Sequence, residues 1–158
     1  MRINVEQGNL LASTADTLVV NLFEGVTAPG GATGAVDRAL NGAISDLIAG
    51  GDFSGKAGEV AVIYPGKAIN ARRVLIAGLG QQDTFNLEGV RKAAATAVKR
   101  ARELKANHVA TIVHGAGIAG LAVPAAAQAT VEGTLLALHR YPAPKQKKEE
   151  DHEIEALS

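Results

Sequence analysis

The sequence between residues 73 and 80 reads RVLIAGLG. All residues from Val74 to Ala77 are apolar, and the run ends at a glycine. A strand with one face in water alternates apolar and polar residues, whereas a strand covered on both faces is apolar at consecutive positions. This stretch therefore predicts a strand of a sheet that carries helices on both faces.

Further segments extend this pattern along the chain. Short apolar, β-branched runs predict strands at residues 3–5, 17–22, 60–64 and 109–113. Apolar residues at helical spacing predict helices at about residues 35–49, 87–104 and 123–139. The expected fold class is α/β: a three-layer α/β/α domain around a mainly parallel or mixed central sheet.

Two of the predicted helices have a defined apolar face. In the first, Val36, Leu40 and Ile44 repeat at helical spacing, and one unbroken helix is expected until Gly50-Gly51 ends it. In the third, the predicted apolar face carries Ala127, Val131, Leu135 and Leu138.

The composition narrows the range of functions. Lys and Arg together number 16, as do Asp and Glu, so that no net charge draws the chain to nucleic acid or to an anionic membrane. The absence of cysteine excludes disulfides, thiolate metal sites and a cysteine nucleophile. Polar residues at positions 4, 6, 7 and 9 interrupt any export-signal core, and no apolar run could span a bilayer. We expect a cytoplasmic protein without nucleic-acid or membrane partners.

Three glycine-rich loops lie next to predicted strands and helices. They contain, in order, Gly30, Gly31 and Gly34; Gly78, Leu79 and Gly80; and Gly115, Gly117 and Ile118. Ligands of α/β sheets bind outside the carboxyl ends of the strands, and backbone N–H groups at a helix N-terminus suit an anion. Together the loops predict a crevice, present or vestigial, for an anion or nucleotide. Each loop alone is equally explained by the glycine that a tight turn needs.

No catalytic or metal-binding constellation is visible in the sequence. The four histidines lack the paired spacing of a zinc site, and the carboxylates are scattered rather than grouped for two metal ions. No nucleophile motif such as GxSxG occurs. We therefore predict no catalytic residue, no metal site and no cofactor in this chain.

Five segments, in order along nearly the whole chain, resemble the N-terminal domain of the leucyl aminopeptidase (cytosol aminopeptidase) family. They are ADTLVVNLFEG (15–25), GDFSGKAGE (51–59), RVLIAGLG (73–80), LEGVRKAA (87–94) and VEGTLLALHRY (131–141). The resemblance implies a macro-domain-like fold. It also implies a parent enzyme that is a cytoplasmic, hexameric aminopeptidase dependent on two zinc or manganese ions, with its metal ligands and catalytic residues in a C-terminal domain.

The same resemblance implies a domain division. Residues 1–141 are expected to form the macro-like N-terminal domain, and residues 142–158 the interdomain linker and the start of the absent catalytic segment. The mixed-charge run from Lys145 to Asp151 suits a solvated linker. The implied partners are the catalytic domain of the same polypeptide and further copies in a hexamer. The chain itself is expected to be inactive and to serve interdomain packing and oligomer support.

A second resemblance implies a different function. Residues 5–10 and 16–21 resemble the opening of ADP-ribose-binding macro domains, and the loops at 30–34 and 115–124 resemble their phosphate loops. However, Asn9 stands where those domains have the Asp that reads adenine, and Glu24 stands near where a second Asn contacts the distal ribose. The alternative is a stand-alone macro-type module that binds ADP-ribose or a related nucleotide. A third possibility is a regulatory site for another anion.

Overall fold

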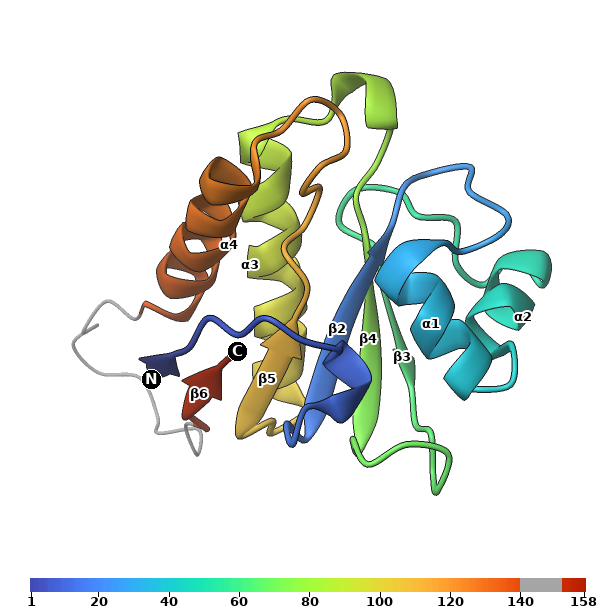
Figure 1. Cartoon of the computed structure of the whole chain (residues 1–158), viewed down its shortest axis with the longest axis horizontal. Helices are drawn as coiled ribbons and strands as arrows, with labels where there is room; N and C mark the ends of the chain where they lie inside the picture. Colours follow the sequence, from blue (N-terminus) through green and yellow to red (C-terminus); the bar gives the residue numbers. More distant parts are fainter. Residues whose placement is uncertain (140–151) are drawn as a thin grey trace, which may run out of the picture.

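The computed structural model describes residues 1–139 and 152–158. Its sheet has six strands in the order β1-β6-β5-β2-β4-β3 (Figure 1). The strands are β1 (Arg2–Ile3), β2 (Thr17–Leu22), β3 (Val60–Ile63), β4 (Arg73–Gly78), β5 (His108–Thr111) and β6 (Ala156–Leu157). β3 runs antiparallel to β4, and all other neighbouring strands are parallel. The sheet is therefore mixed and mainly parallel, as predicted.

The helices form the two outer layers. They are α1 (Gly31–Ala39), α2 (Ala43–Ala49), α3 (Leu87–Glu103) and α4 (Val123–Leu138), with short 3₁₀ turns η1 (Leu10–Ala12) and η2 (Gln82–Thr84). α1 and α2 cover one face of the sheet, whereas α3 covers the other face with α4 packed beside it (Figure 1). The predicted three-layer arrangement is confirmed. Within the described residues, no helix is both long and apolar enough to cross a membrane.

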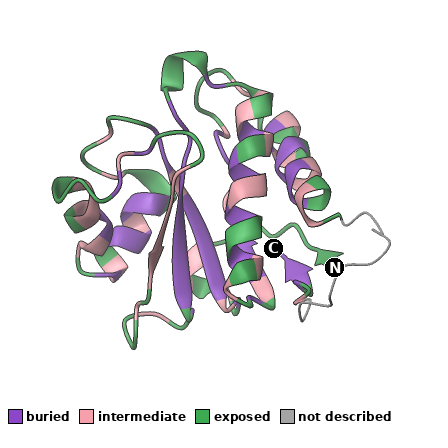
Figure 2. Ribbon diagram, turned by 180° about the vertical axis from the view of Figure 1, so that it is seen from behind, coloured by how far each residue is buried: buried purple, intermediate pink, exposed green. Residues whose placement is uncertain are grey.

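The stretch that predicted the fold lies at the centre of the sheet. β4 is buried along its whole length, as the figure seen from behind also shows for the sheet centre (Figure 2). Val74 and Ile76 pack in the core beneath α1 and α2, whereas Leu75 and Ala77 pack in the core beneath α3. Consecutive apolar residues are needed because each face of this strand meets its own helical layer.

The first predicted helix is two helices, so the expectation of one unbroken helix is wrong. The break lies at Asn41 and Gly42, whose φ angles are 55° and 85°. Asp37, a buried residue of α1, compensates for the break by capping α2. Its carboxylate accepts hydrogen bonds from the N–H groups of Ile44 (2.8 Å) and Ser45 (3.0 Å) and from the Ser45 hydroxyl (2.5 Å). The carboxylate thus provides hydrogen-bond acceptors for the free N–H groups at the start of α2. The spacing of apolar residues in the sequence does not reveal such a cap.

The apolar face of α4 also differs from the prediction. The buried side carries the small residues Ala126, Ala129, Thr130, Gly133 and Thr134, whereas Leu135 of the predicted face is exposed. At Gly133, a methyl group would collide with the main chain of Arg91 in α3. The two helices therefore approach too closely for leucine, and small side chains take the contact.

The end of the chain belongs to the sheet. Residues 142–158 were expected to be a linker and the start of another segment; the part of that range before residue 152, and the boundary at 141, lie outside the described residues. In the described part, β6 inserts between β1 and β5, with Ile154 and Leu157 buried against α3 and its neighbours. β1 pairs with β6 alone, so the chain end also ties down the N-terminus.

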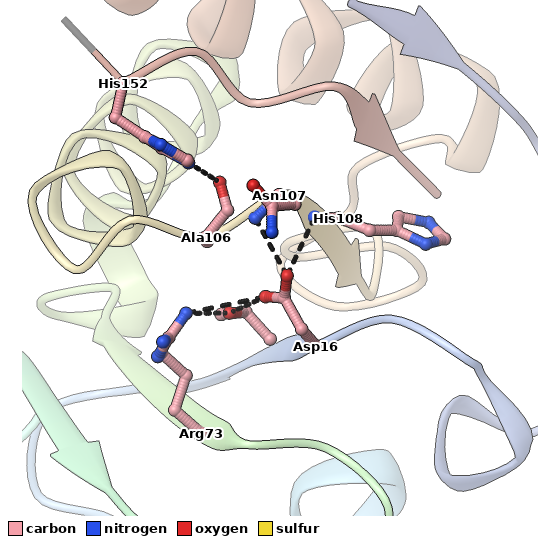
Figure 3. A network of polar contacts seen from close by, with 7 residues as sticks. Asp16, Arg73, Ala106, Asn107, His108 and His152 are labelled. Atoms are coloured by element: carbon pink, nitrogen blue, oxygen red, sulfur yellow. Dashed lines mark hydrogen bonds and ion pairs between the residues drawn. The ribbon is translucent and has the colours of Figure 1, made fainter.

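Asp16 joins three strands at the amino-terminal ends of β2 and β4, opposite the glycine loops (Figure 3). One carboxylate oxygen accepts N–H bonds from Asn107 and His108, and the other accepts from the Thr17 hydroxyl and faces Arg73 at 3.5 Å. Burial alone would raise the pKa of Asp16, but these hydrogen bonds and the Arg73 charge outweigh it and lower the pKa. The carboxylate therefore helps to align β2, β4 and β5.

Loss of the Asp37 cap should destabilise the domain. In Asp37→Ala, the N–H groups at the start of α2 lose their acceptor, and we expect a fall of about 1–3 kcal/mol in the free energy of unfolding. Urea denaturation followed by circular dichroism measures the change. The control is Asp46→Asn, which alters an exposed carboxylate in the first turn of the same helix and should change stability by at most about 0.5 kcal/mol. Equal stability of the two variants would refute the capping role.

Candidate functional site

A cleft of about 530 Å³ lies at the carboxyl ends of β2 and β5. Its walls include both outer glycine loops, since Gly30, Gly31, Gly115 and Ile118 all line it. Gly34 and Gly117 are not among the lining residues. Gly34 instead allows α1 to start close to the Pro29 carbonyl, which a side chain at this position would meet at 2.5 Å. Four of the six residues named from the sequence thus meet in one cavity.

A second hollow of about 450 Å³ adjoins this cleft. The two share Ala32, Ile112 and Val113 on their walls. The second hollow is lined further by Asn9 and Ser158 among others. Asn9 also caps η1, because its side-chain oxygen accepts the Leu11 N–H at 3.0 Å. Sequence reasoning missed this hollow because its walls come from both ends of the chain.

The middle glycine loop, which contains Gly78 and Gly80, does not line the cleft, so the prediction that all three loops share one crevice is wrong. A methyl group at Gly78 would collide with the Lys56 carbonyl oxygen. The Gly55–Lys56 segment is itself held by Glu59, whose carboxylate accepts N–H bonds from Ser54 and Lys56 at 3.1 and 3.0 Å. The glycine here permits close chain packing, which is a structural role.

Main-chain groups, rather than charged side chains, dominate the cleft. No side chain caps the first turn of α1. On the opposite wall, Gly115 has a φ of 71°, and the N–H groups of Ala116 and Ile118 already donate to the carbonyl oxygens of Val113 and Gly115. Among the residues lining the cleft and its neighbouring hollow, the charged one is Glu6. An anion in the cleft would therefore be held by N–H groups and the dipole of α1.

A buried histidine lies beneath this cleft. His114 is 1% exposed, and burial lowers its pKa to about 4. The neutral ring accepts a hydrogen bond at Nδ1 from the Asn21 amide, at 2.9 Å. Asn21 lines the cleft, and its main-chain carbonyl oxygen accepts a hydrogen bond from the Thr33 hydroxyl of α1 at 2.7 Å. His114 and Thr33 thus join the ends of β2 and β5 to the first turn of α1, and the sequence carried no pattern to indicate this.

The described residues do not suit a metal ion. They contain no group of three or more His, Asp or Glu side chains placed to share one. Glu24, whose carboxylate was considered beside a diphosphate, is exposed and does not line the cleft.

Comparison with known sequences points to one family. Residues 19–148 match the model of the N-terminal domain of the cytosol aminopeptidase family. A relative named "Probable cytosol aminopeptidase" from Roseiflexus castenholzii is 35% identical over 160 residues. The alignment covers 100% of this chain but 30% of the relative, so the chain spans less than a third of that protein's length.

Comparison with solved structures shows two kinds of neighbour. A tomato leucine aminopeptidase mutant superposes with a TM-score of 0.77 at 19% identity, covering 98% of this chain and 31% of that one. A Trypanosoma brucei macrodomain in complex with ADP superposes with a TM-score of 0.71 at 19% identity, covering 87% of this chain and 58% of that one. These likenesses confirm the macro-domain-like fold.

The buried histidine should make stability depend on pH. Between the unfolded pKa of 6.5 and the folded value of about 4, the unfolded chain binds a proton that the folded chain does not. The free energy of unfolding should therefore fall as the pH drops through this window, by about 3 kcal/mol in total. The pKa values of Asp16 and Glu59 are also lowered in the folded chain. Protonation of these two carboxylates should therefore reduce the free energy of unfolding further below about pH 4.

Urea denaturation at several pH values tests this effect. His114→Gln should lose the slope between pH 6.5 and 4, because glutamine does not titrate. His139→Gln is the matched control, since His139 is exposed, and this variant should keep the slope. An unchanged slope in His114→Gln would exclude His114 as the source.

Proposed function

Since the chain belongs to the cytosol aminopeptidase family, as its N-terminal domain, we propose that it is the non-catalytic part of a longer aminopeptidase. Its work is to pack against the catalytic domain of the same polypeptide and to support the oligomer, a cytoplasmic hexamer. Zinc or manganese would be bound by that other domain, because the described residues of this chain provide no set of metal ligands.

The outer face of α4 is the observation that carries this proposal. Helices at the surface of water-soluble proteins normally turn charged residues outward, but Glu132 is the single charged residue of α4. Glu132 is itself engaged with Arg91 of α3 at 2.8 Å. Val123, Leu135 and Leu136 remain exposed, Leu136 to 71%. In Figure 2, exposed and half-buried residues alternate with buried ones along this helix.

A second protein surface is the natural cover for these leucines. Contiguous exposed apolar residues typically mark an interaction site. The close contact of α4 with α3 leaves Leu135 and Leu136 outward, whereas Leu138 packs against the core beneath α3. Relatives that are about three times as long as this chain supply further polypeptide that could bury them.

Leu136→Glu tests the packing role. In the 158-residue chain the substitution should leave the melting temperature nearly unchanged, because this side chain is exposed. In a protein that joins the chain to the catalytic domain of a cytosol aminopeptidase, it should lower the melting temperature by several degrees and weaken the oligomer, because a buried carboxylate would lie in the interface. Differential scanning calorimetry and light scattering measure the two effects.

The control is Pro124→Glu, which places a carboxylate at another exposed position, in the first turn of α4, where the helix dipole favours it. The proposal fails if both substitutions leave the longer protein unaffected. Metal-dependent hydrolysis of leucine p-nitroanilide by the 158-residue chain would contradict the non-catalytic role.

A second candidate function is binding of ADP-ribose or a related nucleotide, or of another anion, in the cleft. The specific support is that two glycine loops line one cavity of about 530 Å³, on a fold shared with a macrodomain that was solved with ADP. Against it stands the lack of a cationic side chain on the cleft walls. Gly30, Gly31, Gly115 and Ile118 are the residues that would contact the ligand.

Titration calorimetry with ADP-ribose distinguishes the two functions. Micromolar binding would favour the nucleotide-binding module, and no heat at millimolar ligand would favour the packing domain. Ala32→Glu should abolish any genuine binding, because a carboxylate in the first turn of α1 repels a phosphate while the helix dipole keeps the fold stable. Binding that survives in Ala32→Glu would not involve this cleft.

A further inference from the structure

The outer edge of β3 has unpaired main-chain groups. β3 is the last strand in the sheet order, and its antiparallel partner β4 occupies one of its two sides. The Gly78 N–H donates to the Glu59 carbonyl at 2.8 Å, which makes these two residues a hydrogen-bonded pair. Because such pairs alternate, Ala61 and Ile63 also bond to β4, whereas the N–H and C=O groups of Val60 and Val62 point outward.

Residues 60–64 carry no protective charge or proline of their own, although β3 is short and Glu59 and Pro65 flank this stretch. Natural edge strands are commonly protected by lysine, proline, a bulge or a covering segment. Residues 60–64 read VAVIY and contain no charge and no proline. Within the described residues, no further strand lies beyond β3. Tyr64, which directly follows β3, is 63% exposed although it is aromatic.

We propose that the β3 edge pairs with the β3 edge of a second copy of this chain, antiparallel and about a two-fold axis at Val62. In that register Val62 faces its own copy, and Val60 faces Tyr64 of the other chain. The outward N–H and C=O groups of Val60, Val62 and Tyr64 then form about six hydrogen bonds between the two chains. The two sheets become one continuous sheet across the dimer.

Side chains and charge fit a second copy. Val60 and Val62 pack toward the α3 face of the sheet, and alternation places Tyr64 on the same face. In the dimer each Tyr64 ring would lie across from Val60 of the other chain, which covers its exposed ring. The net charge of zero, with no charge among residues 60–64, leaves no repulsion at the axis. The short strand implies a small interface and therefore a weak dimer.

Sedimentation and amide exchange together test this proposal on the 158-residue chain. The mass should rise from 16.2 kDa toward twice that value as the concentration increases, over a range of about 10 µM to 1 mM for a weak association. Over the same range the amides of Val60, Val62 and Tyr64 should exchange about tenfold more slowly. The amides of Ala61 and Ile63, which bond to β4, should be protected at every concentration.

Val62→Pro removes one outward N–H and no hydrogen bond to β4, so it should fold and remain monomeric. Val62→Thr is the matched control, because it keeps the N–H and the branched shape, and it should still dimerise. If Val62→Pro fails to fold, Tyr64→Lys provides the same test with an exposed charge at the edge. A monomer at all concentrations, a dimer that survives these edge substitutions, or a dimer whose outward amides stay unprotected would overturn the proposal.

Discussion

The parallel pairing of β2 with β4, buried on both faces, is the constraint on which the rest of the structure depends. The two strands are paired from Thr17 and Arg73 to Leu22 and Gly78. A sheet centre that is apolar on both faces requires a helical layer on each side, and parallel neighbours require long connections that supply those helices. The Asp16 network aligns one end of these strands, and the glycine-lined cleft opens at the other.

Close packing in the outer layer determines which surfaces the domain presents. Because α4 contacts α3 through Gly133 and neighbouring small residues, Leu135 and Leu136 are left in contact with water. The same face of a less closely packed helix would have entered the core. The exposed Leu136 side chain does not contribute its hydrophobic burial energy to this fold. Contact with another protein surface would bury the side chain and supply that energy. The structure of this domain is thus compatible with a role inside a larger assembly.

The cleft has a different physical character. Its polar capacity comes from main-chain N–H groups and from Asn21, which the neutral ring of His114 holds in place. N–H groups of this kind can bind an anion without any cationic side chain, but they bind it less strongly without one. The fold is macro-domain-like, and the exposed leucines of α4 support the proposed packing role.

Much of the fold could be predicted from sequence, because its signals are local. The consecutive apolar residues of β4, the spacing in α3 and the proline in the first turn of α4 depend on immediate neighbours, and the predicted elements lie close to the observed ones. Two glycine loops of the cleft were identifiable for the same reason, since tight turns need glycine near strand ends.

Tertiary structure alone decided the features that depend on contacts between distant segments. Gly133 lets α4 approach Arg91 of α3 closely, and the middle glycine loop packs at Gly78 against Lys56 and does not line the cleft. β6 is a strand of two residues that becomes recognisable beside β1 and β5. The physical reason is that a sequence pattern states how strongly a residue prefers burial, whereas the partner that buries it is chosen by packing across the whole chain.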